Sequence, residues 1–194
     1  MPVGVTFTCH VGHPGNPRPP CEIVHIGGLD PYSEYHGFYL GWPIAGADVV
    51  PTRENWPIHC YAHVGVARDL SPDTGTGAEL YAVIGHAPRQ LDRNIAVVGR
   101  VIEGIEHLAT LPRGKGEAGV YDHPRLRVPI VSVRLGDELP EAERPSFEYL
   151  ASDSESFARY VEVRANRNDA FYRVPAGGVD VCNVQVPIRR VQPG

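Results

Sequence analysis

Long apolar runs, lysine and an export signal are scarce or absent in this sequence. No stretch approaches the ~20 apolar residues that a membrane-crossing helix needs, so a soluble chain is expected. The first residues show neither a basic start nor a sustained apolar run, which predicts no export signal. The compartment stays open: the cytoplasm is the default location, and the periplasm is the alternative for a longer parent chain.

Lysine occurs once, as Lys115, among 18 basic residues. Because arginine and lysine carry the same charge, this skew indicates codon usage in a GC-rich genome more than phosphate binding. The formal net charge is −5 and no basic run is present, so a nucleic-acid partner is not expected. The four cysteines lie too far apart for a disulfide scaffold, although one structural disulfide is compatible with them.

Glycine and proline are abundant, with 21 and 19 residues respectively. So many breakers leave few long helical windows, which argues against a helix bundle. Apolar residues make up 42% of the chain, enough for one sizeable core.

The chain divides into three parts by pattern. Residues 1–29 form a Pro/Gly-rich irregular arm, 30–139 a β-rich body, and 140–194 a helical extension. Aromatic residues between 30 and 56 are interrupted by glycine and proline, which predicts irregular packed structure or short strands. Strands are expected, from alternation or apolar runs, over residues 22–26, 58–67, 79–86, 95–102 and 128–135.

The remaining segments have loop or helix signals. Residues 70–77 have the composition of a loop, and 79–86 have the near-continuous apolar pattern of a strand buried on both faces. A short helix is expected over 103–111. Ser152 and Glu155 have the spacing of a capping box, which predicts a helix over 153–166 with an apolar stripe through Phe157 and Tyr160.

Metal sites are weakly indicated. The N-terminal arm holds five potential zinc ligands within 17 residues, but their spacing matches no known ligand pattern: Cys9, His10, His13, Cys21 and His25. His59 and His63 would share one face of a strand, with Cys60 pointing away, so packing is favoured over metal binding there. No nucleophile elbow or phosphate loop is present, and the carboxylates show no placeable catalytic pair.

Residues 74–112 resemble the second half of the cyclophilin-type peptidyl-prolyl isomerases, and the match extends over about 61–135. The family pattern is a loop leading into a strand with two aromatics, a Leu-Asp turn, and a strand ending in Gly-Arg-Val-x-Glu-Gly. The matching positions are Thr76-Gly77-Ala78-Glu79, Leu80-Tyr81, Leu91-Asp92 and Val98-Gly99-Arg100-Val101-Ile102-Glu103-Gly104. Residues 64–69 and 128–135 are similar to two further barrel strands, and 140–194 to the extension of a bacterial branch.

The resemblance implies a mainly β fold with minor α: a cyclophilin-like antiparallel barrel followed by a C-terminal helix. It also implies an isomerase that rotates X–Pro peptide bonds in unfolded proteins or peptides, without a cofactor or a metal. The site residues carried over from the family are substrate-binding ones: Ala67, Arg68, Glu79, Tyr81, Gln90, Leu91 and Ile95. Tyr81 and Leu91 keep the apolar pocket character, whereas Glu79, Gln90, Ile95 and Arg68 depart from the family's glutamine, tryptophan, histidine and asparagine.

The family's first half has no counterpart here. Residues 1–60 contain no Phe-x-Arg-Val or Gln-x-Gly-Asp motif, so the catalytic arginine is missing, and the Pro-rich start is expected to be too short for three strands and a helix. An incomplete barrel in an N-terminally shortened chain is therefore expected, with weak or no turnover and with Arg68 or Arg53 as substitute. The alternatives are a non-catalytic proline-peptide binding module and a Cys/His metal-binding protein.

Overall fold

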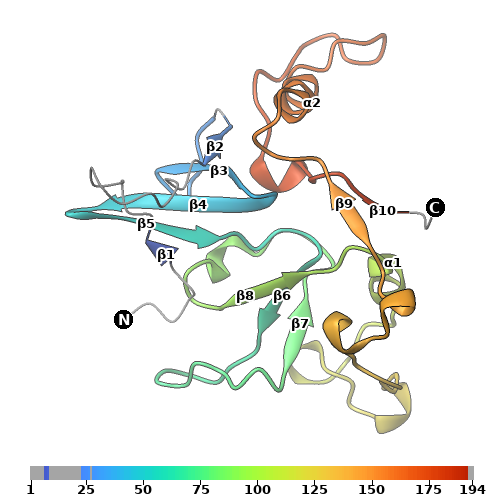
Figure 1. The fold of residues 1–194 in the computed structure, drawn as a ribbon. Coiled ribbons are helices and arrows are strands. Elements are labelled where there is room, and N and C mark those ends of the chain that lie inside the picture. Colours follow the sequence, from blue (N-terminus) through green and yellow to red (C-terminus); the bar gives the residue numbers. More distant parts are fainter. Residues whose placement is uncertain (1–6, 9–22, 27, 192–194) are drawn as a thin grey trace.

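The computed structural model describes residues 7–8, 23–26 and 28–191. Within these residues it holds ten strands, arranged in three antiparallel sheets, and two α-helices (Figure 1). Neither helix has the length and apolarity of a membrane-spanning segment, and no other helix in the described part does.

The largest sheet has five strands in the order β1-β5-β4-β3-β2. Its centre is a meander of three strands joined by tight turns, and its edges are two-residue strands. The strands are β1 (Phe7–Thr8), β2 (Val24–His25), β3 (Tyr35–Tyr39), β4 (Trp42–Val49) and β5 (Thr52–Pro57). The expectation that the start of the chain is too short for three strands and a helix is therefore wrong for the strands, whereas no helix precedes β6 among the described residues. Because antiparallel neighbours need only a two-residue turn, 23 residues suffice for the central three.

A three-stranded sheet follows, in the order β7-β6-β8, and it carries the region that resembles the isomerases. Its strands are shorter than predicted: β6 (His63–Val66), β7 (Leu80–Ala82) and β8 (Val97–Arg100). Residues 58–62 precede β6 without joining a strand, and 70–77 form the expected loop. The predicted burial of β7 on both faces is wrong, since Leu80 is 59% exposed.

The predicted strand over residues 128–135 is absent. This segment pairs with no other described segment, and its apolar side chains face solvent, with Val131 95% exposed. Alternation predicts a strand only where a neighbouring strand can take its backbone hydrogen bonds, and none lies beside it. Consistent with this gap, the sheets do not close into a barrel.

Helix α1 (Ile105–Ala109) follows β8, and the C-terminal segment after it holds both helical and strand structure. There the longer α2 (Glu155–Ala165) lies between β9 (Phe147–Tyr149) and β10 (Ile188–Arg190), which pair with each other. The cap of α2 is Ser154, whose hydroxyl accepts from the Phe157 N–H at 3.1 Å. The predicted cap, Ser152, is instead buried and accepts a hydrogen bond from the Gly41 N–H.

The core joins the five-stranded sheet to the C-terminal segment. Phe38 of β3 and Phe157 of α2 are fully buried, with ring centroids 5.0 Å apart in an edge-to-face arrangement. Trp56 and Val184 belong to the same cluster. A disulfide between Cys60 and Cys182 ties residues 181–186 to the chain just before β6. The apolar stripe of α2 is confirmed as its packing face.

Candidate functional site

The candidate site lies on the three-stranded sheet, where β6 and β7 pair. Gly65 of β6 lies opposite Tyr81 of β7, and the tyrosine ring lies over the glycine. A Cβ atom at position 65 would be 2.4 Å from the ring and hydroxyl of Tyr81, closer than atoms pack. Glycine at this position therefore permits the ring to lie flat against the strand.

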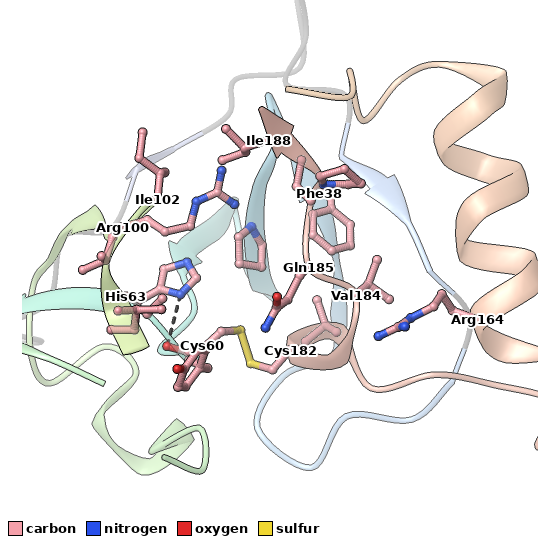
Figure 2. A pocket seen from close by; sticks show the side chains of 18 of the residues that line it. Phe38, Cys60, His63, Arg100, Ile102, Arg164, Cys182, Val184, Gln185 and Ile188 are labelled. Carbon is pink, nitrogen blue, oxygen red and sulfur yellow. Dashed lines mark hydrogen bonds between the residues drawn. A yellow bond between two sulfur atoms is a disulfide. The ribbon is translucent and has the colours of Figure 1, made fainter. Parts of the chain in front are cut away.

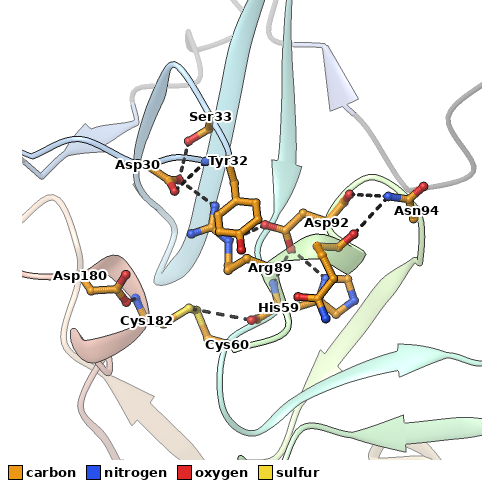
Figure 3. A network of polar contacts seen from close by, with 11 residues as sticks. Asp30, Tyr32, Ser33, His59, Cys60, Arg89, Asp92, Asn94, Asp180 and Cys182 are labelled. Carbon is orange, nitrogen blue, oxygen red and sulfur yellow. Dashed lines mark hydrogen bonds and ion pairs between the residues drawn. A yellow bond between two sulfur atoms is a disulfide. The ribbon is translucent and has the colours of Figure 1, made fainter. Parts of the chain in front are cut away.

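The hydroxyl of Tyr81 is held by a buried histidine. It lies 2.9 Å from Nε2 of His59. The Nδ1 atom of the same ring lies 2.9 Å from Oδ1 of Asp92, and Figure 3 shows His59 and Asp92 together. The imidazole and phenol rings are 6.3 Å apart and nearly parallel. In a neutral imidazole, Nδ1–H donates to Asp92 and Nε2 accepts from the phenol. Burial, with a smaller contribution from Asp92, raises the pKa of Tyr81, so the phenol keeps its proton at neutral pH.

Asp92 is fixed in turn by a buried ion cluster. Arg89 donates to Asp92 at 2.5 Å and to Asp30 at 2.7 Å, and all three side chains are nearly inaccessible (Figure 3). Burial by itself raises the pKa of Asp30, but hydrogen bonds from Arg89, Ser33 and the Tyr32 N–H outweigh it and lower this pKa. Removing a partner from such a cluster leaves a buried charge uncompensated, which is strongly unfavourable. The cluster therefore holds the chain Asp92–His59–Tyr81 in one geometry.

Hydrogen bonds link several of the predicted substrate-binding residues to neighbouring segments. The Ala67 N–H donates to the carbonyl of Glu79 at 2.9 Å, which joins the end of β6 to the start of β7. Arg68 Nε donates to the carbonyl of Asn94 at 3.1 Å, and this joins β6 to the turn that holds Leu91. We use the name peptide groove for the whole set of residues that the sequence predicts to bind substrate: Ala67, Arg68, Glu79, Tyr81, Gln90, Leu91 and Ile95.

The groove residues differ in exposure. Tyr81, Leu91 and Ile95 are half-buried, whereas Glu79 and Gln90 are exposed. Leu91 closes the 3-10 turn Arg89–Leu91, and its carbonyl accepts from the Ile95 N–H at 3.0 Å. The set therefore combines half-buried apolar or aromatic side chains with exposed polar ones, a composition that suits a side chain such as proline.

The two candidate substitute arginines lie in different sheets. Arg68 follows β6 of the three-stranded sheet, while Arg53 is on β5 of the five-stranded sheet, paired with Asp48 at 2.8 Å and lying over the ring of Tyr35. The sequence gives no sign of this difference, because it does not show that β5 and β6 belong to different sheets.

The predicted shared face of His59 and His63 is wrong. His59 points to Asp92, whereas His63 Nδ1 contacts the carbonyl of Cys60 at 3.1 Å and its ring packs against Trp42. Strand alternation does not apply, because only His63 belongs to β6. Within the described part of the chain no group of three or more metal-ligating side chains gathers. The N-terminal cysteine and histidine ligands lie outside the described residues, apart from the backbone of His25.

The polar chain behind Tyr81 was missed at the level of sequence. His59 is 22 residues from Tyr81 and 33 residues from Asp92 along the chain. Arg89 and Asp30 of the ion cluster are 59 residues apart. Leu91-Asp92 was recognised as part of the isomerase pattern, but nothing in that pattern pointed to His59.

No protein-family model matches this chain, and no curated protein matches it. A solved structure does: the crystal structure of the cyclophilin AquaCyp293 from Hirschia baltica, with a TM-score of 0.62 and 23% sequence identity. The match covers 95% of this chain and 63% of that chain. The fold is therefore cyclophilin-like, mainly antiparallel β-sheet with few helices, and the chain spans less than two thirds of that protein.

Proposed function

We propose that the peptide groove binds X–Pro segments of unfolded proteins and rotates their X–Pro bonds, without a cofactor. The observation that carries the proposal is the position of Tyr81, held over Gly65 by His59 in a cyclophilin-like fold. In this proposal a proline ring packs against the phenol ring and the half-buried side chains of Leu91 and Ile95.

Rotation of the peptide bond needs no nucleophile. The barrier of ~18–20 kcal/mol comes from the partial double bond between carbon and nitrogen. In the twisted state the conjugation is lost and the prolyl nitrogen becomes a hydrogen-bond acceptor, so a donor placed beside it lowers the barrier. Arg68 is the guanidinium of the groove, and it is assigned this role.

Arg68 is already partly engaged. Its Nε donates to the carbonyl of Asn94 and one terminal nitrogen donates to the carbonyl of Asp69 at 2.6 Å. These bonds fix the guanidinium, and the second terminal nitrogen is left to contact substrate. A guanidinium tied to the backbone in this way is expected to give slower turnover than one directed wholly at the prolyl nitrogen.

A protease-coupled assay on a proline peptide tests the proposal. The purified chain should accelerate isomerisation, and Arg68→Gln should reduce the rate about tenfold or more, since one charged hydrogen bond to the twisted state is lost. Arg53→Gln is the matched control, because it removes the same charge from the other sheet, and its rate should stay at the wild-type value. Equal rates for all three proteins, or no acceleration at all, would contradict the assignment of Arg68.

A non-catalytic proline-peptide binding module is the second candidate. The two backbone bonds of Arg68 favour it, because they reduce the guanidinium's freedom to follow a rotating substrate. Chemical-shift titration with the same peptide separates the two functions: binding at the groove without faster cis–trans exchange selects the module. In either case Tyr81→Ala should abolish the shifts, and persistence of the shifts would show that the peptide binds elsewhere.

A further inference from the structure

A pocket lies between the start of β6, the end of β8, α2 and the C-terminal segment (Figure 2). Its volume is about 450 Å³, within the range of small-molecule sites. None of the seven groove residues lines it. The disulfide between Cys60 and Cys182 forms part of its wall and joins the two segments that enclose it.

The lining of this pocket is cationic and contains no carboxylate. Arg100 and Arg164 are its two charged residues, and Figure 2 shows them at opposite sides. Arg164 donates to the carbonyl of Asn183 at 2.8 Å and lies over the ring of Tyr160. Arg100 differs: among the described residues its guanidinium has no hydrogen-bond or carboxylate partner, and it lies 5.7 Å from the ring centre of Trp42. Burial lowers the pKa of Arg100, because part of its hydration is lost and no described carboxylate compensates the charge.

His63 supplies the second unpaired group. Its side chain is 3% exposed, and its Nε2 is buried without a partner within the described part of the chain. Its Nδ1 faces the carbonyl of Cys60, so in the neutral ring Nδ1 carries the proton and Nε2 is an acceptor. Figure 2 shows the imidazole between the Cys60 carbonyl and the guanidinium of Arg100.

We propose that this pocket binds a small 2-hydroxycarboxylate that has an apolar side chain. The carboxylate accepts hydrogen bonds from Arg100, and the neighbouring hydroxyl donates to Nε2 of His63. The apolar body packs against Ile102, Ile105 and Ile188, which line the same pocket and are at least partly exposed. The proposal is independent of the isomerase function, because it uses none of the groove residues.

The donor pattern selects this class among small acids. A plain carboxylate offers acceptors only, so it satisfies Arg100 but leaves the His63 nitrogen without a donor. A 2-oxo acid adds a further acceptor opposite that nitrogen. A 2-amino acid offers a donor, but its ammonium group would lie beside an uncompensated guanidinium. The hydroxyl group alone supplies a donor without adding positive charge.

Calorimetric titration of the full chain at pH 7 with 3-phenyllactate and 3-phenylpropionate tests the proposal. These probes differ only by the hydroxyl group, and we expect phenyllactate to bind about fivefold or more tightly, as one hydrogen bond to a buried acceptor implies. Quenching of tryptophan fluorescence should accompany binding, because Arg100 lies over Trp42. Equal affinities for the two probes, or no heat with either one at millimolar concentration, would overturn the proposal.

Three variants assign the contacts. Arg100→Gln should weaken both probes about tenfold or more, whereas Arg164→Gln removes an equal charge from the same pocket and should change either affinity less than threefold. His63→Asn keeps a donor for the Cys60 carbonyl but removes Nε2, so phenyllactate should then bind no better than phenylpropionate. Equal weakening by the two arginine variants would contradict the contact with Arg100, because it would show that only the net positive charge of the pocket matters. Unchanged discrimination between the probes in His63→Asn would contradict the hydrogen bond from the hydroxyl group to His63. Circular dichroism and thermal unfolding verify that each variant folds.

Discussion

Loss of the Cys60–Cys182 disulfide should strongly destabilise the chain. The crosslink joins residues separated by 122 positions, so it closes a long loop and restricts the unfolded chain severely. For a loop of this length the chain-entropy relation gives about 16 cal/mol/K, or about 5 kcal/mol at 25 °C. Native stabilities are about 5–15 kcal/mol, so a third or more of the free energy of unfolding depends on this bond.

Equilibrium unfolding in urea measures the effect. The Cys60→Ala, Cys182→Ala double variant should have a free energy of unfolding about 2–5 kcal/mol below that of the oxidised wild type. As a second measurement, both proteins are unfolded with and without dithiothreitol. The change in unfolding free energy of the double variant gives the contribution of Cys9 and Cys21, which is subtracted from the change in the wild type. A loss below about 1 kcal/mol would refute the reasoning. It would mean that the C-terminal segment is held in place by the core alone, and that the crosslink adds nothing to it.

Three further results are expected. Arg89→Gln leaves two buried carboxylates without their cation and should cost about 3–5 kcal/mol in urea unfolding; a loss under 1 kcal/mol would show that water reaches the cluster. His63, whose pKa burial lowers to about 4, binds a proton more readily when unfolded, so stability should fall by about 3 kcal/mol from pH 7 to pH 4, and His63→Asn should lose less over that range. Gly65→Ala should displace the ring of Tyr81 and weaken proline-peptide binding at least fivefold in the chemical-shift titration, whereas Gly99→Ala, which meets its nearest atom at an ordinary 3.7 Å, should bind normally.

The local elements were largely readable from the sequence. The loop over residues 70–77, the two helices and the packing face of α2 follow from turn chemistry, capping and apolar spacing, which act over a few residues. The cyclophilin-like fold was also indicated, because the order of motifs from Thr76 to Gly104 resembles that family. The cap residue itself was displaced by two positions, because Ser152, which has the capping-box spacing to Glu155, is held by a distant contact with Gly41 and Ser154 caps the helix instead.

The tertiary structure decided everything that depends on which distant segment lies alongside. Residues 128–135 alternate like a strand, yet they have no strand partner among the described residues, whereas residues 35–57 form three strands despite their glycines and prolines. The support of Tyr81 by His59, and the pocket with its unpaired Arg100, depend on contacts between residues many positions apart. The sequence by itself therefore determined the local conformations and the family resemblance. Pairing, burial and the two candidate binding sites were decided only by folding, because hydrogen bonds and desolvation act between neighbours in space.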